Sequence, residues 1–255
     1  MALLTDKSPS YVEDLISYDS GILEVAKNES VNLESKLGVA WEALQLEVDA
    51  FLLHHSGSHQ KGVGSAGPSS AGVVVNTAMR RWHALQTLTL VYTDLYGSQR
   101  NNRYQVKANQ FERMTRDAKE LVLLTGLGLV WKPIPKAPKP NVMPEGTGSL
   151  TGTFLLQTQY CGTQVESGAP SEEVPVVVAG AAALRISLNH SQSHPAAGYH
   201  VYLRTPDRNW GRQTSSPVAS NEAWLFGGQL VQGQEAGEGQ APDYQIRLQR
   251  ILPKG

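Results

Sequence analysis

The sequence predicts a multidomain α+β protein, in which an N-terminal α-helical bundle is followed by an all-β sandwich. Apolar residues recur every three or four positions in the first half of the chain and alternate with polar residues in the second half, which are the periods of helices and strands. A proline- and lysine-rich stretch separates the halves. The predicted domains are residues 1–130 for the bundle, 131–149 for a linker and 150–255 for the sandwich.

The first half contains five expected helical segments. Ser8 followed by Pro9 is a typical helix start, and Asn32 is placed to cap a longer helix. The acidic residues between the apolar positions of that longer helix predict a polar outer face. Gly97 and later Gly126 predict helix ends. The expected segments cover residues 9–18, 22–27, 32–54, 73–96 and 100–125, and together they make a small antiparallel bundle.

Two stretches are expected to lack regular structure. Residues 56–72 are rich in glycine and serine, so they have little side-chain area to bury and we expect a mobile loop. Residues 132–140 contain four prolines, which cannot donate backbone hydrogen bonds, with lysines between them. This second stretch predicts an extended, solvated spacer between the domains.

The second half contains short runs that alternate apolar and polar residues. Glycine, proline, asparagine and serine clusters separate these runs at intervals of roughly 10 to 20 residues, near the spacing expected of a β-sandwich. The expected strands cover residues 154–156, 174–178, 184–188, 199–203, 223–226 and 244–248.

The composition excludes several classes of protein. With 22 basic and 23 acidic side chains in 255 residues, the chain is not uniformly basic as a general nucleic-acid binder would be. The single cysteine, Cys161, excludes an internal disulfide framework and a cysteine-based zinc site. No apolar stretch approaches the roughly 20 residues that cross a bilayer, and the N-terminus lacks a secretory signal. We therefore expect no membrane association. No catalytic, cofactor-binding or metal-binding motif stands out, so we expect no enzyme and no cofactor.

Charge is distributed unevenly along the helical half. Residues 1–50 hold ten acidic and three basic side chains, whereas residues 61–140 hold twelve basic and four acidic ones. One interpretation is a heterologous contact between subunits, in which the acidic side of one copy meets the basic side of the next. A second is that the two regions neutralise each other within one bundle. A third is a strip that faces phosphates.

Basic residues of this second region are the candidate subunit and DNA-channel interface. The candidates are Arg80, Arg81, Arg100, Arg103, Lys107, Arg113, Arg116, Lys132, Lys136 and Lys139. Four aromatic residues of the second half are a candidate sandwich surface that could bind carbohydrate, although large aromatic side chains more often pack in a core. They are Tyr199, Tyr202, Trp210 and Trp224.

The second half carries a resemblance at residues 195–205. The run Pro-Ala-Ala-Gly-Tyr-His-Val-Tyr-Leu-Arg-Thr resembles the third-strand region of fibronectin type III and related immunoglobulin-like domains, where a small turn leads into a Tyr-x-Val-Tyr strand. The resemblance implies that the sandwich is immunoglobulin-like.

The helical half is similar to the head-tail connector (adaptor) proteins of tailed bacteriophages and prophages. The similarity lies in the short N-terminal helices, the long helix at 32–54, the runs at 80–85 and 92–96, and the helix that starts at Arg100. It implies a structural virion protein that is assembled in the host cytoplasm. Copies would form a homo-oligomeric ring that binds the portal protein above and a neck or tail protein below, with contact to DNA in the channel.

The main alternative is a module that binds a carbohydrate or a protein through its β-sandwich, with the helices as its support. An enzyme ranks third, behind these two options, because no pair of carboxylates, catalytic triad or metal-ligand set is evident in the sequence.

Overall fold

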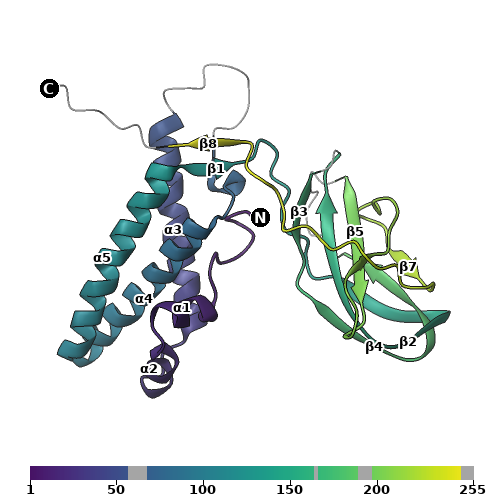
Figure 1. Cartoon of the computed structure of the whole chain (residues 1–255), viewed down its shortest axis with the longest axis horizontal. Coiled ribbons are helices and arrows are strands. Elements are labelled where there is room, and N and C mark those ends of the chain that lie inside the picture. Colours follow the sequence, from purple (N-terminus) through teal and green to yellow (C-terminus); the bar gives the residue numbers. More distant parts are fainter. Residues whose placement is uncertain (57–67, 164–165, 189–196, 248–255) are drawn as a thin grey trace. The chain divides into compact units, whose positions relative to one another are not determined.

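The computed structural model describes residues 1–56, 68–163, 166–188 and 197–247 (Figure 1). The chain divides into two compact units. The β unit contains Met1–Asp6 and Lys132–Ala241, and the helical unit contains Lys7–Trp131 and Pro242–Gly255. The protein is α+β, with an N-terminal helical region followed by a mostly antiparallel β region, as the two periods of the sequence predict.

The described part of the helical unit contains five α-helices. They are α1 (Val12–Tyr18), α2 (Ile22–Asn28), α3 (Leu33–Ser56), α4 (Thr77–Gln99) and α5 (Asn102–Thr125). Asparagine caps begin the three long helices, because the Oδ1 atoms of Asn32, Asn76 and Asn101 accept hydrogen bonds from backbone N–H groups of the first turn at 2.8–3.0 Å. The first helix begins later than predicted, since the Ser8 hydroxyl donates to the Ser10 carbonyl instead of capping.

Helix α4 is the centre of the bundle, because α3 packs on it and it packs on α5 (Figure 1). Its Trp82, Leu85, Leu88 and Tyr92 are fully buried. Helix α4 also continues past the predicted end at Gly97 and stops at Arg100, which adopts a left-handed conformation with φ 52°.

A two-stranded antiparallel sheet closes one side of the helical unit. Strand β1 (Leu127–Leu129) pairs with β8 (Tyr244–Ile246). Close packing requires glycine at Gly128, where a Cβ atom would lie 2.8 Å from the Cβ of Pro242. Val73 and Val74 are predicted to be helical, but in the structure they are extended. Both form backbone pairs with residues of β1. Because β8 pairs with β1 in the helical unit, the prediction that the strand at 244–248 belongs to the sandwich is wrong.

The described residues of the β unit form six strands in one hydrogen-bonded sheet. They are β2 (Asn141–Cys161), β3 (Ser167–Pro170), β4 (Val174–Ser187), β5 (Gly198–Arg204), β6 (Gly211–Arg212) and β7 (Trp224–Phe226). Their order is β6-β5-β2-β4-β7, and β3 pairs with β2. The two strands predicted at 174–178 and 184–188 are one continuous strand, β4.

The sheet bends over its own core. The register between β2 and β4 shifts between Glu145 and Gly152, and such irregularities bend strands. Residues of β4 and β5, which are not neighbours in the sheet, belong to one buried cluster. The Tyr199 hydroxyl of β5 also donates to the Ile186 carbonyl of β4 at 3.3 Å. One curved sheet therefore encloses the core of the β unit.

The predicted linker, apart from Trp131, belongs to this unit. Ile134 and Ala137 are buried in its core. Three of the donors between the prolines have partners: Ile134 N–H donates to Gln240 Oε1 at 2.7 Å, Lys136 N–H to Asp6 Oδ1 at 2.7 Å and Ala137 N–H to the Ala169 carbonyl at 3.2 Å. The stretch is thus anchored by its non-proline donors and differs from the expected solvated spacer. Strand β2 then begins at Asn141, inside the predicted linker.

Candidate assembly surfaces

A buried ionic network ties helix α5 to the turn between α1 and α2. Lys107 Nζ lies 2.6 Å from Asp19 Oδ2 and 3.3 Å from the Tyr92 hydroxyl, and that hydroxyl donates to the same carboxylate. Burial acts to raise the pKa of Asp19, but the hydrogen bonds from Lys107 and Tyr92 outweigh it and hold that pKa below its usual value. Lys107 therefore anchors α5 to this turn within the bundle.

Further acidic groups of the first helices are also satisfied within the bundle. Glu47 pairs with Lys119, and Glu29 accepts hydrogen bonds from Gln99 and from the Tyr104 hydroxyl, the latter at 2.7 Å. Part of the charge asymmetry is thus neutralised inside the helical unit, as the second interpretation of the sequence predicts.

The remaining arginines of the candidate interface are exposed, but they do not form one strip. Arg80 and Arg81 lie in the first turn of α4, whereas Arg100 and Arg103 lie where α4 ends and α5 begins. The helical rise places these pairs about 30 Å apart, at opposite ends of α4. Arg113 and Arg116 lie on the outward side of α5, and Arg116 contacts Glu112 at 3.3 Å.

An apolar stripe runs along the outer face of α3. Val39, Leu46 and Leu53 recur every seven residues and are 49%, 72% and 75% exposed. Ala43 and Ala50 lie between them, which completes a spacing of four, three, four and three residues along one side of the helix. The inner face of α3 buries a different apolar set that includes Leu37 and Leu44.

This stripe corrects the prediction that the outer face of the long helix is polar. The sequence holds a second apolar set at three- and four-residue spacing, which the single predicted stripe does not include. Glu42 is exposed beside the stripe. Asp49 lies on the same flank and accepts hydrogen bonds from the backbone N–H and hydroxyl of Ser70 at 2.8 and 3.0 Å. The outer face of α3 is therefore both apolar and acidic.

The candidate aromatic surface of the β unit is mostly interior. Tyr199 and Tyr202 are buried, and the Tyr202 hydroxyl donates to Gln159 Oε1 at 3.0 Å. They cannot form the exposed platform considered from the sequence, because both rings are buried although they lie on opposite faces of β5. Trp210 is partly exposed, and the Arg204 guanidinium lies 4.9 Å from its ring. Trp224 is partly exposed and stacks on Phe226.

Trp224 lines a polar pocket of 320 Å³. Its lining includes the acidic Glu222 and the hydroxyl residues Thr214, Ser215 and Ser216. Gln213 also lines it, with its amide bonded to Gly211 and Val231. The Thr214 hydroxyl is also hydrogen-bonded to His200 Nδ1 at 2.8 Å, which fixes one wall. An aromatic ring among such groups has the chemistry that binds a sugar.

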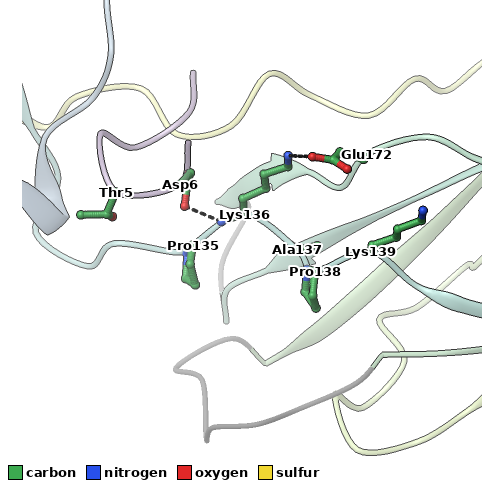
Figure 2. Close-up of a pocket in the computed structure, with 8 residues that line it drawn as sticks. All are labelled: Thr5, Asp6, Pro135, Lys136, Ala137, Pro138, Lys139 and Glu172. Atoms are coloured by element: carbon green, nitrogen blue, oxygen red, sulfur yellow. Dashed lines mark hydrogen bonds and ion pairs between the residues drawn. The ribbon is translucent and has the colours of Figure 1, made fainter. Parts of the chain in front are cut away.

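A second pocket, of 360 Å³, lies where Thr5 and Asp6 meet the proline- and lysine-rich stretch (Figure 2). Lys136 and Lys139 line it together with Asp6 and Glu172, and Lys136 Nζ approaches Glu172 at 3.5 Å. The Lys136 side chain is 15% exposed, while Lys132 and Lys139 are exposed. These three candidate lysines thus belong to the β unit, whereas Lys107 and the candidate arginines belong to the helical unit.

A buried serine–histidine pair was not anticipated from the sequence. The Ser10 hydroxyl lies 2.6 Å from His83 Nδ1, and His83 Nε2 lies 3.1 Å from the Leu37 carbonyl. Since a carbonyl only accepts, Nε2 carries the proton and Nδ1 accepts from Ser10. Burial lowers the pKa of His83 to about 4. Both side chains are fully buried, so the pair links the segment before α1 to α3 and α4 in the interior of the helical unit.

Comparison with known proteins does not assign a class. The chain matches no family model, and no curated protein is significantly similar to it. Within the described ranges, the helices include none that is long and apolar enough to span a membrane.

Proposed function

We propose that this chain is a non-enzymatic structural protein of a tailed phage or prophage, a head-tail connector whose copies form a ring in the virion. The observation that carries the proposal is the apolar stripe on α3. Three large apolar side chains exposed in one line favour a protein–protein contact. Burying one leucine fully stabilises a contact by about 1.5–3 kcal/mol.

The rest of the helical unit supports this role. Its helix order and lengths are those on which the similarity to connector proteins rests. The ring binds the portal protein on one side and a neck or tail protein on the other. Exposed arginines at both ends of α4 supply cations for neighbouring subunits and for DNA in the channel.

The β unit is proposed to be an immunoglobulin-like sandwich that decorates the ring. Its antiparallel strands and the core shared by β4 and β5 support this assignment. The bend of β2 and β4 would divide the single sheet into the two facing layers of a sandwich.

The mass of the full chain in solution tests the proposed function. Light scattering and negative-stain microscopy are performed on the protein alone and after mixing with portal and tail particles from its source. We expect rings, or monomers that join rings when a portal is present. A chain that stays monomeric and ignores every particle component would contradict the proposal.

A second function is favoured by the pocket beside Trp224, which suits a carbohydrate ligand. A glycan array with the full chain tests it, because Trp224→Ala should abolish any saturable binding. Trp210→Ala is the matched control, since Trp210 is absent from the residues that line the pocket. Binding that survives Trp224→Ala would exclude this pocket as the sugar site.

A further inference from the structure

We propose that the apolar stripe of α3 in one copy packs against the outward face of the N-terminal half of α5 in the next copy. The inference rests on the proposed function, because it names the surfaces through which copies would assemble. Such a contact is heterologous, so repeating it generates a ring when the rotation closes.

The α3 side is built for a second helix. Its large residues Val39, Leu46 and Leu53 alternate with Ala43 and Ala50, and small residues between large ones let another helix approach closely. From Val39 to Leu53 the stripe is about 21 Å long, given 1.5 Å per residue. That length corresponds to about four helical turns.

The outward face of α5 offers matching chemistry. Arg103, Val106, Gln110 and Arg113 follow a spacing of three, four and three residues and are all exposed, so they share one side of the helix. Val106 is 67% exposed. This line therefore presents an apolar side chain between two cations over about 15 Å.

Charge selects α5 rather than a second α3 as the occupant. A symmetric pair of α3 stripes would bring the acidic flanks, Glu42 and Asp49, of both copies together, which is unfavourable. Arg103 and Arg113 oppose those flanks with the complementary sign. Within one copy α3 and α5 both pack on α4 and also meet at the pair of Glu47 and Lys119. The stripe of α3 and the line from Arg103 to Arg113 on α5 are both exposed, so the proposed contact forms only between copies.

Reversal of charge on each face tests the proposal. The acid-face variant carries Glu42→Lys and Asp49→Lys, and the basic-face variant carries Arg103→Glu and Arg113→Glu. Light scattering of the full chain measures assembly, and circular dichroism confirms that each variant retains its helices. We expect each variant alone to lose assembly. An equimolar mixture should recover it, because every α3–α5 contact in an alternating ring is then complementary.

Removal of apolar area gives an independent test. Leu46→Asn should weaken assembly about tenfold to a hundredfold, as expected for the loss of one buried leucine. Leu225→Asn is the matched control, because Leu225 is an exposed leucine of the β unit. It should assemble as the wild-type chain does.

The outcomes separate this inference from the function on which it rests. A basic-face variant that assembles like the wild type would overturn the α5 assignment and indicate a symmetric α3 pair. Wild-type rings that tolerate all variants would overturn the inference and leave the connector function standing. A wild-type chain that never assembles would overturn both.

Discussion

The helical unit and the β unit bury polar groups of different kinds. The helical unit encloses an ionised network around Asp19 and the neutral His83. The most buried polar side chains of the β unit, such as Gln159 and Thr158, carry no charge. The hydroxyls of Tyr199 and Tyr202 donate to neutral oxygens. Because buried ions respond to pH and to loss of a partner more strongly than neutral groups do, the helical unit should be the more sensitive of the two.

The largest expected effect is in the helical unit. Asp19→Ala removes the partner of the partly buried Lys107 ammonium and of the buried Tyr92 hydroxyl, and it should lower the free energy of unfolding by about 3 kcal/mol. Urea unfolding followed by circular dichroism measures the loss. Asp94→Ala breaks the more exposed pair with Lys36 and should cost under about 1 kcal/mol. Equal losses in the two variants would contradict a special role for the buried network.

Acidification should sharpen the comparison. Burial lowers the pKa of His83 from 6.5 to about 4, so between these values the unfolded chain binds a proton that the folded chain does not. Stability contributed by this residue is complete above pH 6.5 and falls by about 3 kcal/mol as the pH drops to 4. Asp19, whose pKa is lowered, adds a further loss at lower pH, when the pH falls through its folded value.

Unfolding by urea at several pH values measures this slope, and hydrogen exchange assigns it to a unit. His83→Gln should flatten it, because the amide does not titrate. In the β unit, burial lowers the pKa of His200, and repulsion from Arg212 lowers it further. Part of the loss of stability on acidification therefore comes from the β unit. An unchanged slope in His83→Gln would rule out His83 as its source.

A smaller effect is expected in the β unit. Tyr202→Phe removes the donor to Gln159 Oε1, while the Gln159 amide keeps its bonds to the Gly168 and Gly237 carbonyls at 2.8 Å. Leaving one neutral acceptor without a partner should cost about 1–2 kcal/mol. Hydrogen exchange of β2 and β5 measures it. A loss as large as that of Asp19→Ala would remove the contrast between the units.

The smallest effect is expected where the outer faces of the helical unit are changed. Arg103→Glu with Arg113→Glu should alter the unfolding free energy of the monomer by no more than about 0.5 kcal/mol per site, because both side chains are exposed. Urea unfolding at a concentration that keeps the chain monomeric measures this. A large loss would mean that these arginines support the fold.

Local signals in the sequence predicted the helices well and the sheet less well. Asn32 caps α3 as expected, because capping depends only on neighbours in the chain. The join of two predicted strands into β4 depends on pairing with β2, which lies elsewhere in the sequence. Leu3 and Leu4 gave no signal of burial in the β unit, since their partners are more than 100 residues away.

The candidate site was predicted in composition but not in arrangement. The excess of acidic and basic side chains could be counted, but no local pattern shows that Lys107 is engaged by Asp19 while Arg103 stays exposed. Tyr199 and Tyr202 lie three residues apart in one strand and are both buried, because neighbours cover both sides of β5. Exposure is set by the elements that pack on a segment, which the segment itself does not encode.

Each unit includes a short segment that is separated in sequence from the rest of that unit by the main stretch of the other unit. Met1–Asp6 belongs with the β unit although residues 7–131 follow it, and β8 belongs with the helical unit although residues 132–241 precede it. A protease that cut once between residues 131 and 132 would therefore produce two fragments that remain non-covalently associated. Each fragment would still carry the end segment that completes the unit formed by the other. Copies that exchanged these end segments would form a domain-swapped assembly.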